Sequence, residues 1–353
     1  MTWRMPAETA PHTCTWMAWP SHGYALGETA AEADEARAAW AAVAHAVSAF
    51  EPVRMVVDPV AVGEARKWLS ADVELLEAPL DDAWMRDIGP TFVIDDGADG
   101  SGGGTPRLGA VDWVFNGWGA QAWARWERDA RIGRFVAEAA GAVVLPSSLV
   151  NEGGGIHVDG AGTVLATRTV QLDPGRNPGL VEADVEAELR ARLGVDRVVW
   201  LPRGLTRDYE ELGTRGHVDI VATMPEPGVV LLHAQRSPEH PDHAVTAQVR
   251  DALSAGLPAD WRLVDLPAPA GLRDEPDPAT GEPGGFVDHS YVNHHVVNGG
   301  VVACAFDDPG DAVARDVLAE AYPGREVVSV DARPIFARGG GIHCITQQQP
   351  ALP

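Results

Sequence analysis

Lysine is almost absent from this chain of 353 residues, in which Lys67 is the single example. A Walker-type phosphate loop needs Gly-Lys before Ser or Thr, so this class of nucleotide site is excluded. A Schiff-base mechanism would have to use Lys67, and the charged residues around Lys67 predict an exposed helix surface. The chemistry of the chain must therefore be sought in other side chains.

Positive charge, cysteine and long apolar runs are scarce as well. The formal net charge is -24 at pH 7, so nucleic acid and anionic membranes, which both reward Lys and Arg, are not expected partners. The three cysteines, Cys14, Cys304 and Cys344, form no C-x-x-C pair and no even disulfide framework, which is typical of a reducing compartment. No segment has 18 uninterrupted apolar residues, and the first residues lack the apolar core of a signal peptide. We therefore expect a cytoplasmic protein.

Short strands and helices alternate along the chain in a pattern that repeats. One repeat has strands at 156–158 and 163–167, a helix at 180–193 and a third strand at 197–201. Segments with the same order begin at 217 and 291, the first strands there being expected at 217–224 and 291–297. Earlier helices are expected at 29–50, 62–69 and 121–140. Because each repeat contains a hairpin, a pure βαβ Rossmann unit is excluded.

The pentapeptide Gly-Gly-Gly-Ile-His occurs twice, at 153–157 and at 339–343, so one half of the chain echoes the other. No shift in composition divides the sequence, and we expect one α/β domain over residues 1–353. Its predicted architecture is a ring of repeats whose glycine-rich strand ends converge on a central site. Two runs rich in Gly, Asp and Pro, at 95–107 and 274–285, are expected to be flexible loops.

Cys344 is the strongest candidate for a nucleophile. It follows a triple glycine that includes Gly340 and Gly341, and glycine lets backbone and ligand approach where a side chain would block them. Cysteine is also the best intrinsic nucleophile among the side chains. The alternative is a small buried hydrophobe, which is the usual role of a free cysteine.

Several acidic residues and one histidine could share a site with this thiol. In Gly-His217-Val-Asp219, the period of a strand would place His217 and Asp219 on one face. Asp87 and Glu152 each lie in a loop next to glycine, and Trp84 precedes Asp87. Carboxylates bind a guanidinium through paired hydrogen bonds, and an indole can lie against its face. Structural alternatives remain: a His-Asp pair that braces a strand end, and capping or turn roles for Asp87 and Glu152.

The sequence resembles the agmatine deiminases, and with them the peptidylarginine deiminase-like proteins, of the guanidine-modifying (pentein) superfamily. The resemblance extends over nearly the whole chain. The blocks that carry it are, in order, Trp16-Met17-Ala18-Trp19-Pro20, Trp84-Met85-Arg86-Asp87, residues 112–119, Asn151-Glu152-Gly153-Gly154, Arg176-Asn177-Pro178, Gly216-His217-Val218-Asp219 and residues 340–350.

The resemblance implies a fold, a reaction and a set of roles. The family fold is a five-bladed α/β propeller with pseudo-fivefold symmetry. By motif match, Cys344 is the nucleophile, His217 the general acid and base, Asp87 and Asp219 the guanidinium clamps, and Glu152 the acid that orients His217. The implied reaction is hydrolysis of a small cationic guanidinium compound, agmatine in the first place, through a covalent thiouronium intermediate without cofactor or metal.

One segment departs from the family pattern. Many agmatine deiminases carry acidic residues just before the Gly-His motif, where the distal amine of the substrate is expected, whereas this chain has Arg215. An arginine there would repel an ammonium and attract the carboxylate of arginine or a guanidino acid. The alternative is that Arg215 faces solvent or pairs with Glu210 or Glu211.

Other classes of function remain as alternatives. A cysteine peptidase or amidase would use Cys344 and His217 but leaves the acidic residues unexplained. A non-catalytic module that binds guanidinium compounds or polyamines explains the acidic residues but not Cys344. A metal site at 239–243 or 294–295 is less favoured than a polar loop that caps the following helix. If copies associate, a homodimer is expected, because two-fold dimers prevail among soluble oligomers.

Overall fold

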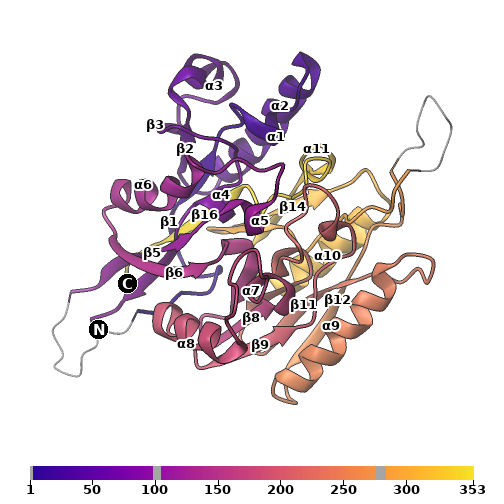
Figure 1. Cartoon of the computed structure of the whole chain (residues 1–353). Helices are drawn as coiled ribbons and strands as arrows, with labels where there is room; N and C mark the ends of the chain where they lie inside the picture. Colours follow the sequence, from indigo (N-terminus) through magenta and orange to yellow (C-terminus); the bar gives the residue numbers. More distant parts are fainter. Residues whose placement is uncertain (1–2, 98–104, 275–283) are drawn as a thin grey trace.

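The computed structural model describes residues 3–97, 105–274 and 284–353 (Figure 1). The loops expected at 95–107 and 274–285 lie for the most part outside these ranges. Within them, every sheet mixes antiparallel and parallel neighbours, and helices connect the parallel strands. The protein is therefore an α/β structure with mixed sheets, as the sequence predicts.

Five sheets share one order of strands. In four of them a hairpin pairs two antiparallel strands, and the second strand takes a parallel neighbour after a helical connection. These sheets consist of β4 (Thr91–Asp95), β5 (Arg107–Val114) and β6 (Val143–Val150); β7 (Ile156–Val158), β8 (Thr163–Thr167) and β9 (Arg197–Leu201); β10 (Ala222–Glu226), β11 (Val229–Ala234) and β12 (Arg262–Pro267); and β13 (His295–Val297), β14 (Gly300–Ala305) and β15 (Glu326–Asp331).

The fifth sheet joins segments from opposite ends of the sequence. β16 (Thr346–Pro350) pairs antiparallel with β1 (His12–Ala18), and β1 then pairs parallel with β2 (Val53–Val57), which is followed by β3 (Glu74–Glu77). The register places Trp16 opposite Gln347. The strand that follows Cys344 is thus held by the first strand of the chain.

The longer helices lie on the outside of the sheets, where α3 (Val62–Trp68), α8 (Glu182–Leu193) and α9 (Asp242–Gly256) are seen at the periphery of Figure 1. α2 (Ala30–Ser48) begins at Thr29, whose hydroxyl and Glu32 form a capping box. α8 ends at Gly194, which adopts the left-handed conformation that favours glycine. The remaining helices are α1 (Gly23–Leu26), α4 (Met85–Ile88), α5 (Gly117–Ala120), α6 (Ile132–Ala139), α7 (Arg168–Gln171), α10 (Gly310–Ala321) and α11 (Arg333–Phe336).

The structure corrects four of the expected elements. The helix expected at 121–140 begins only with a 3₁₀ turn at Asp129–Arg131, because the tryptophans before it pack in an irregular loop. Residues 218–220 form a 3₁₀ turn, so β10 starts at Ala222 and not at His217. β13 likewise starts at His295 rather than at residue 291. Pro241, and not a polar side chain, occupies the start of α9.

The apolar core is continuous around the segment that carries Cys344. The largest buried cluster joins side chains of α2, β1, β2 and β14 to Trp84 and Cys344. Two smaller clusters lie beneath α8 and α9. No helix in the described ranges combines the length and apolar character that crossing a bilayer requires.

Helix α10 offers a test of this packing. Leu318 is 0% exposed whereas Val313 on the same helix is 50% exposed. We expect Leu318→Ala to lower the free energy of unfolding by about 3 kcal/mol through lost burial and a cavity, and the control Val313→Ala to change it by less than about 0.5 kcal/mol. Denaturant unfolding measures both, and equal effects would contradict the burial of this helix face.

Candidate active site

Cys344 lies in the turn that precedes β16, and its side chain is only 5% exposed. The peptide nitrogen of Arg86 in α4 donates to the Cys344 carbonyl at 3.0 Å, which joins this turn to the short helix that carries Asp87, where the sequence had suggested a loop. A Cβ atom at Gly340 would lie 2.6 Å from the Trp84 ring and 3.1 Å from Cys344 Sγ. The glycine approach to the thiol is therefore a requirement of packing, as its sequence suggested.

Asn293 is a neighbour of the thiol that the sequence analysis missed. Its Nδ2 donates to Cys344 Sγ at 3.3 Å and to the Asp219 carbonyl at 3.2 Å. Its Oδ1 accepts from the peptide nitrogen of His343 at 3.0 Å and lies so close to Gly341 that a Cβ there would be 2.4 Å away. Because residues 291–297 had been assigned to one strand, no signal in the sequence set Asn293 apart.

His217 and Asp219 both reach this centre, but not as members of one strand. They flank Val218 at the start of the 3₁₀ turn, so the predicted period of two is wrong and the turn brings both side chains to the same volume. His217 Nε2 lies 3.2 Å from Glu152 Oε2, and His217 Nδ1 lies 3.8 Å from Asp87 Oδ1. A Cβ at Gly154 would be 2.4 Å from His217 Nδ1, so glycine is needed there too.

Hydrogen bonds hold the carboxylates of Asp87 and Asp219 in place, and one oxygen of Asp219 stays unpaired. Asp87 accepts from the Trp118 indole nitrogen at 2.8 Å and from the Gly154 peptide nitrogen at 3.2 Å. Asp219 Oδ2 lies 2.8 Å from His343 Nδ1 and 3.6 Å from Cys344 Sγ. Among the described residues, Asp219 Oδ1 and His217 Nδ1 are buried atoms without a hydrogen-bond partner. Unpaired buried polar atoms are costly, and together they form a receptor for a polar ligand.

Charges of both signs set the pKa of His217 and of its acidic neighbours. Burial alone would lower the pKa of His217, but Asp87, Glu152 and Asp219 raise it to about 9. Burial raises the pKa of Asp87 to about 6, with Glu152 and Asp219 adding to the effect. For Glu152 the effect of burial is outweighed by Arg176 and His217, which lower its pKa to about 2. His217 is thus an imidazolium at neutral pH.

The thiol itself is not activated in the free protein. Burial, together with the charges of Asp219 and Asp87, raises the pKa of Cys344 well above its ordinary value, although Asn293 acts in the opposite direction. Cys344 is therefore a neutral thiol in an acidic pocket. A cation bound against Asp87 and Asp219 would offset the part of this elevation that their charges cause.

Glu152 is supported by a buried ion-pair chain. Arg176 Nε lies 3.0 Å from both carboxylate oxygens of Glu152, and Arg176 Nη1 donates to Asp173 at 2.9 Å. Arg215 Nη1 donates to the same Asp173 carboxylate at 2.9 Å, with a side chain that is 39% exposed. Arg215 therefore pairs with Asp173 instead of Glu210 or Glu211, a partner that sequence spacing did not suggest. Glu152 makes no capping hydrogen bond, so the capping alternative fails for it.

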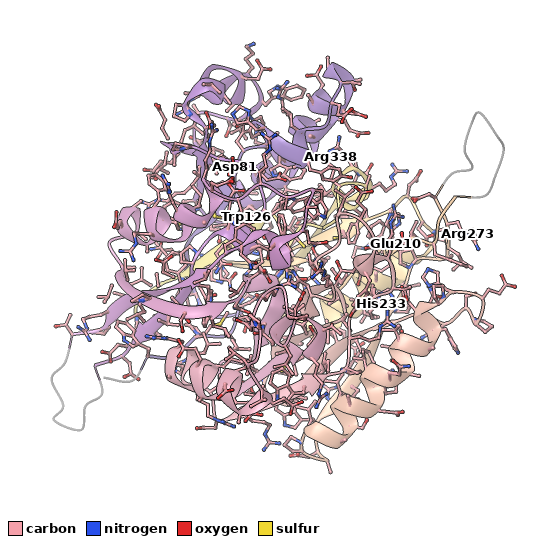
Figure 2. The ribbon with its side chains drawn as sticks, in the orientation of Figure 1. Asp81, Trp126, Glu210, His233, Arg273 and Arg338 are labelled. Atoms are coloured by element: carbon pink, nitrogen blue, oxygen red, sulfur yellow. The ribbon has the colours of Figure 1, made fainter. Side chains whose placement is uncertain are left out.

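Trp118 connects this centre to a cavity of about 830 Å³. Trp118 lines the cavity while its indole binds Asp87, and Trp123 stacks on Trp118 with ring centroids 5.3 Å apart. Asp81 and Arg338, both labelled in Figure 2, also line it. The acidic members of the lining outnumber its three arginines; they are Glu28, Glu32, Glu35, Asp81 and Asp82. Trp84 lies deeper, packed edge-on against Trp40.

At 239–243 and 294–295, the residues His240, Asp242, His294 and His295 are buried, and the histidines make hydrogen bonds within the protein. His240 Nε2 donates to the Val287 carbonyl at 2.9 Å, and His294 Nδ1 donates to the Tyr291 carbonyl at 2.9 Å. In the part of the chain that the structure describes, a different trio, Glu8, His157 and His343, brings its ligand-type atoms within 4.8 Å of one another. Arg86 Nη1 lies 3.6 Å from Glu8, which disfavours a dication there.

Comparison with known proteins gives a consistent result. A family model described as Porphyromonas-type peptidyl-arginine deiminase matches residues 4–350. A Streptomyces coelicolor protein with a provisional agmatine deiminase name is 56% identical over 353 residues, 99% of each chain. Agmatine deiminase of Ectopseudomonas mendocina is 40% identical over 98% of this chain and 95% of its own length. The solved agmatine deiminase of Enterococcus faecalis superposes with a TM-score of 0.88 at 30% identity, over 100% of this chain and 97% of that one.

The charge state of His217 can be measured directly. Histidine-labelled NMR should show His217 titrating with a pKa of about 9, so that it is charged below this pH and loses its proton above it. Glu152→Gln removes one of the carboxylates that raise this pKa, and we expect the value to fall by about one unit or more. His294, with a pKa of about 4, serves as the internal control. An unchanged His217 titration in Glu152→Gln would contradict the proposed role of Glu152.

Proposed function

The chain belongs to the Porphyromonas-type peptidyl-arginine deiminase family, and on this premise we propose that it hydrolyses agmatine to N-carbamoylputrescine and ammonia. The observation that carries the proposal is the arrangement around Cys344. A thiol, an imidazolium and two carboxylates converge, and among the described atoms Asp219 Oδ1 and His217 Nδ1 lack partners. A planar guanidinium has several N–H donors that suit Asp219 Oδ1 and one electrophilic carbon that suits the thiol, while His217 Nδ1–H, itself a donor in the imidazolium, stays free to give its proton to the departing nitrogen.

Asp87 and Asp219 bind the guanidinium from two sides and place its central carbon against Cys344 Sγ. Both are carboxylates whose remaining bonds already fix their orientation, so little is lost in positioning them. The bound cation keeps both carboxylates ionised and replaces the water that they would otherwise bind. Trp84, next to Gly340, closes the pocket with an apolar wall.

The covalent step follows from the two charge states. On binding of the guanidinium, the Cys344 thiol loses its proton to solvent, because the cation stabilises the thiolate; the sulfur then attacks the guanidinium carbon and forms a carbon–sulfur bond. His217, already protonated, gives its proton to the departing amino group, and the carbon–nitrogen bond breaks to release ammonia. The neutral His217 then takes a proton from water, whose oxygen attacks the thiouronium carbon. The carbon–sulfur bond breaks, and the carbamoyl product leaves a regenerated thiolate.

The charged residues that line the cavity select the tail of the substrate. Agmatine carries an ammonium at its far end, and the acidic lining beyond Trp118 favours that cation. An unpaired Arg215 would attract the carboxylate of arginine or a guanidino acid. That charge is neutralised by Asp173, which is bonded to it at 2.9 Å, so arginine and guanidino acids lose the contact that would have favoured them.

The wider arrangement of the chain is part of the same proposal. The five sheets, each with the antiparallel-then-parallel order, are the five blades of one propeller domain that spans residues 1–353, with the site near its centre. Cys14, Cys304 and Cys344 are all free thiols, which supports a cytoplasmic location. A homodimer stays a prediction.

Cys344→Ala tests the chemistry. We expect it to abolish ammonia release from agmatine, a loss of at least about a thousandfold, while agmatine still binds in calorimetry because Asp87 and Asp219 remain. Cys304→Ala, at another buried thiol, is the matched control and should retain most activity. If the wild-type protein binds agmatine but releases no ammonia, the chain is a binding module and not a deiminase.

Arg215→Gln tests the reading of the substrate tail. Because Arg215 is neutralised by Asp173, we expect the ratio of kcat/KM for agmatine to that for arginine to change by less than about threefold. The same steady-state assay on Asp173→Asn, which frees the charge of Arg215, should lower agmatine turnover. A tenfold or larger gain in agmatine preference for Arg215→Gln would instead assign the substrate tail to Arg215.

A further inference from the structure

His343 immediately precedes the nucleophile, yet the mechanism above leaves it unused. Its imidazole is buried and bonded at both nitrogens to carboxylates. Nδ1 lies 2.8 Å from Asp219 Oδ2, and Nε2 lies 2.8 Å from Glu8 Oε1. Glu8 comes from the segment before β1, far from the site in sequence, and is also buried. The three groups form a continuous bridge from the first residues of the chain to the substrate clamp.

The two hydrogen bonds of His343 determine the protonation state of its imidazole. An ionised carboxylate only accepts hydrogen bonds, so an imidazole held between two of them must donate from both nitrogens and is an imidazolium. Burial and Arg86 would lower the pKa of His343, but Glu8 and Asp219 outweigh them and raise it. The pKa of Asp219 is lowered despite its burial, with His343 the leading cause. Charge-assisted bonds of this kind are short and strong.

We propose that Glu8 and His343 are positioning residues of the deiminase: they hold Asp219 ionised and turn its free Oδ1 toward the substrate. The proposal rests on the function argued above. Oδ2 of Asp219 is occupied by His343, which leaves Oδ1 as the atom that meets the guanidinium. Without the bridge, a carboxylate this deeply buried would gain a proton or rotate away from the clamp.

The geometry favours a proton over a metal ion between these residues. Two ligand atoms on one zinc ion, each at about 2.0 Å, would stand more than about 3 Å apart in a tetrahedral site, whereas Glu8 Oε1 and His343 Nε2 are 2.8 Å apart. The Arg86 guanidinium, 3.6 Å from Glu8, adds a permanent cation beside them. His157 Nδ1 lies 3.8 Å from Glu8 and its Nε2 faces the Thr223 hydroxyl at 3.0 Å.

The experiment compares Glu8→Gln with Glu51→Gln. Both glutamates are buried and paired with a histidine, but the His12–Glu51 pair has no bond to Asp219. We expect Glu8→Gln to lower kcat/KM for agmatine by about 10- to 100-fold, the value of one or two charge-assisted bonds, mainly through a higher KM. Glu51→Gln should leave KM within about threefold, even where both variants lose thermal stability.

The pH profile separates positioning from packing. Loss of the imidazolium neighbour raises the pKa of Asp219, so the acid limb of kcat/KM should move to higher pH in Glu8→Gln and in His343→Asn, and not in Glu51→Gln. The groups that face His343 and could add to the profile are Glu8, Asp219, Arg86, His157, His294 and His295. If Glu8→Gln does not fold, His343→Asn carries the same measurement.

The outcomes are distinct. Ammonia release by the wild-type protein tests the deiminase function itself, and its absence would refute that function rather than the bridge. Given wild-type activity, a KM and an acid limb in Glu8→Gln equal to those of Glu51→Gln would overturn the bridge. So would stoichiometric zinc in the purified protein together with loss of activity on chelation, because the trio would then be a metal site.

Discussion

The ion pair between Arg176 and Glu152 is the interaction on which the rest of the site depends, since both side chains are 0% exposed. A carboxylate this deep would otherwise take up a proton, and breaking such a pair by removing one partner costs about 3–5 kcal/mol. Paired with Arg176, Glu152 stays ionised and can hold His217 as an imidazolium. On the proposed mechanism, the proton that the departing amino group needs is therefore already on His217 before substrate binds.

In the free site, both a carboxylate and the thiol have raised pKa values. Burial raises the pKa of both Asp87 and Cys344, and the charges of neighbouring carboxylates add to the effect. On the proposed mechanism, a bound guanidinium offsets the charges of these carboxylates, so that binding of the substrate and activation of the nucleophile occur together.

Most of the fold could be predicted because helices and strands with clear periodicity stayed where the sequence placed them, as with α2, α8 and β7 to β9. The wrongly predicted elements are those that contribute residues to the candidate site or its cavity. The 3₁₀ turn at Val218–Ile220 resembles a strand in sequence because Val218 and Ile220, on either side of Asp219, are β-branched. The helix expected at 121–140 was interrupted by tryptophans that line the cavity.

Some residues of the candidate site could likewise be predicted from the sequence, and others could not. Cys344, His217, Asp219, Asp87 and Glu152 could be assigned because each stands in a recognisable motif, and the structure brings them together. Asn293 and Glu8 could not, since their roles exist only through contacts with residues some 50 and 335 positions away in the sequence. Arg215 was placed in the right loop, but its partner, Asp173, was set by tertiary structure.

The pairing of β1 with β16 has a consequence for how the protein comes to be made. On the ribosome, Asp87, Glu152, His217 and Asn293 all emerge before Cys344, and β1 must wait with an open edge until residues 346–350 appear. The thiol can thus enter its pocket only after these four residues have been made.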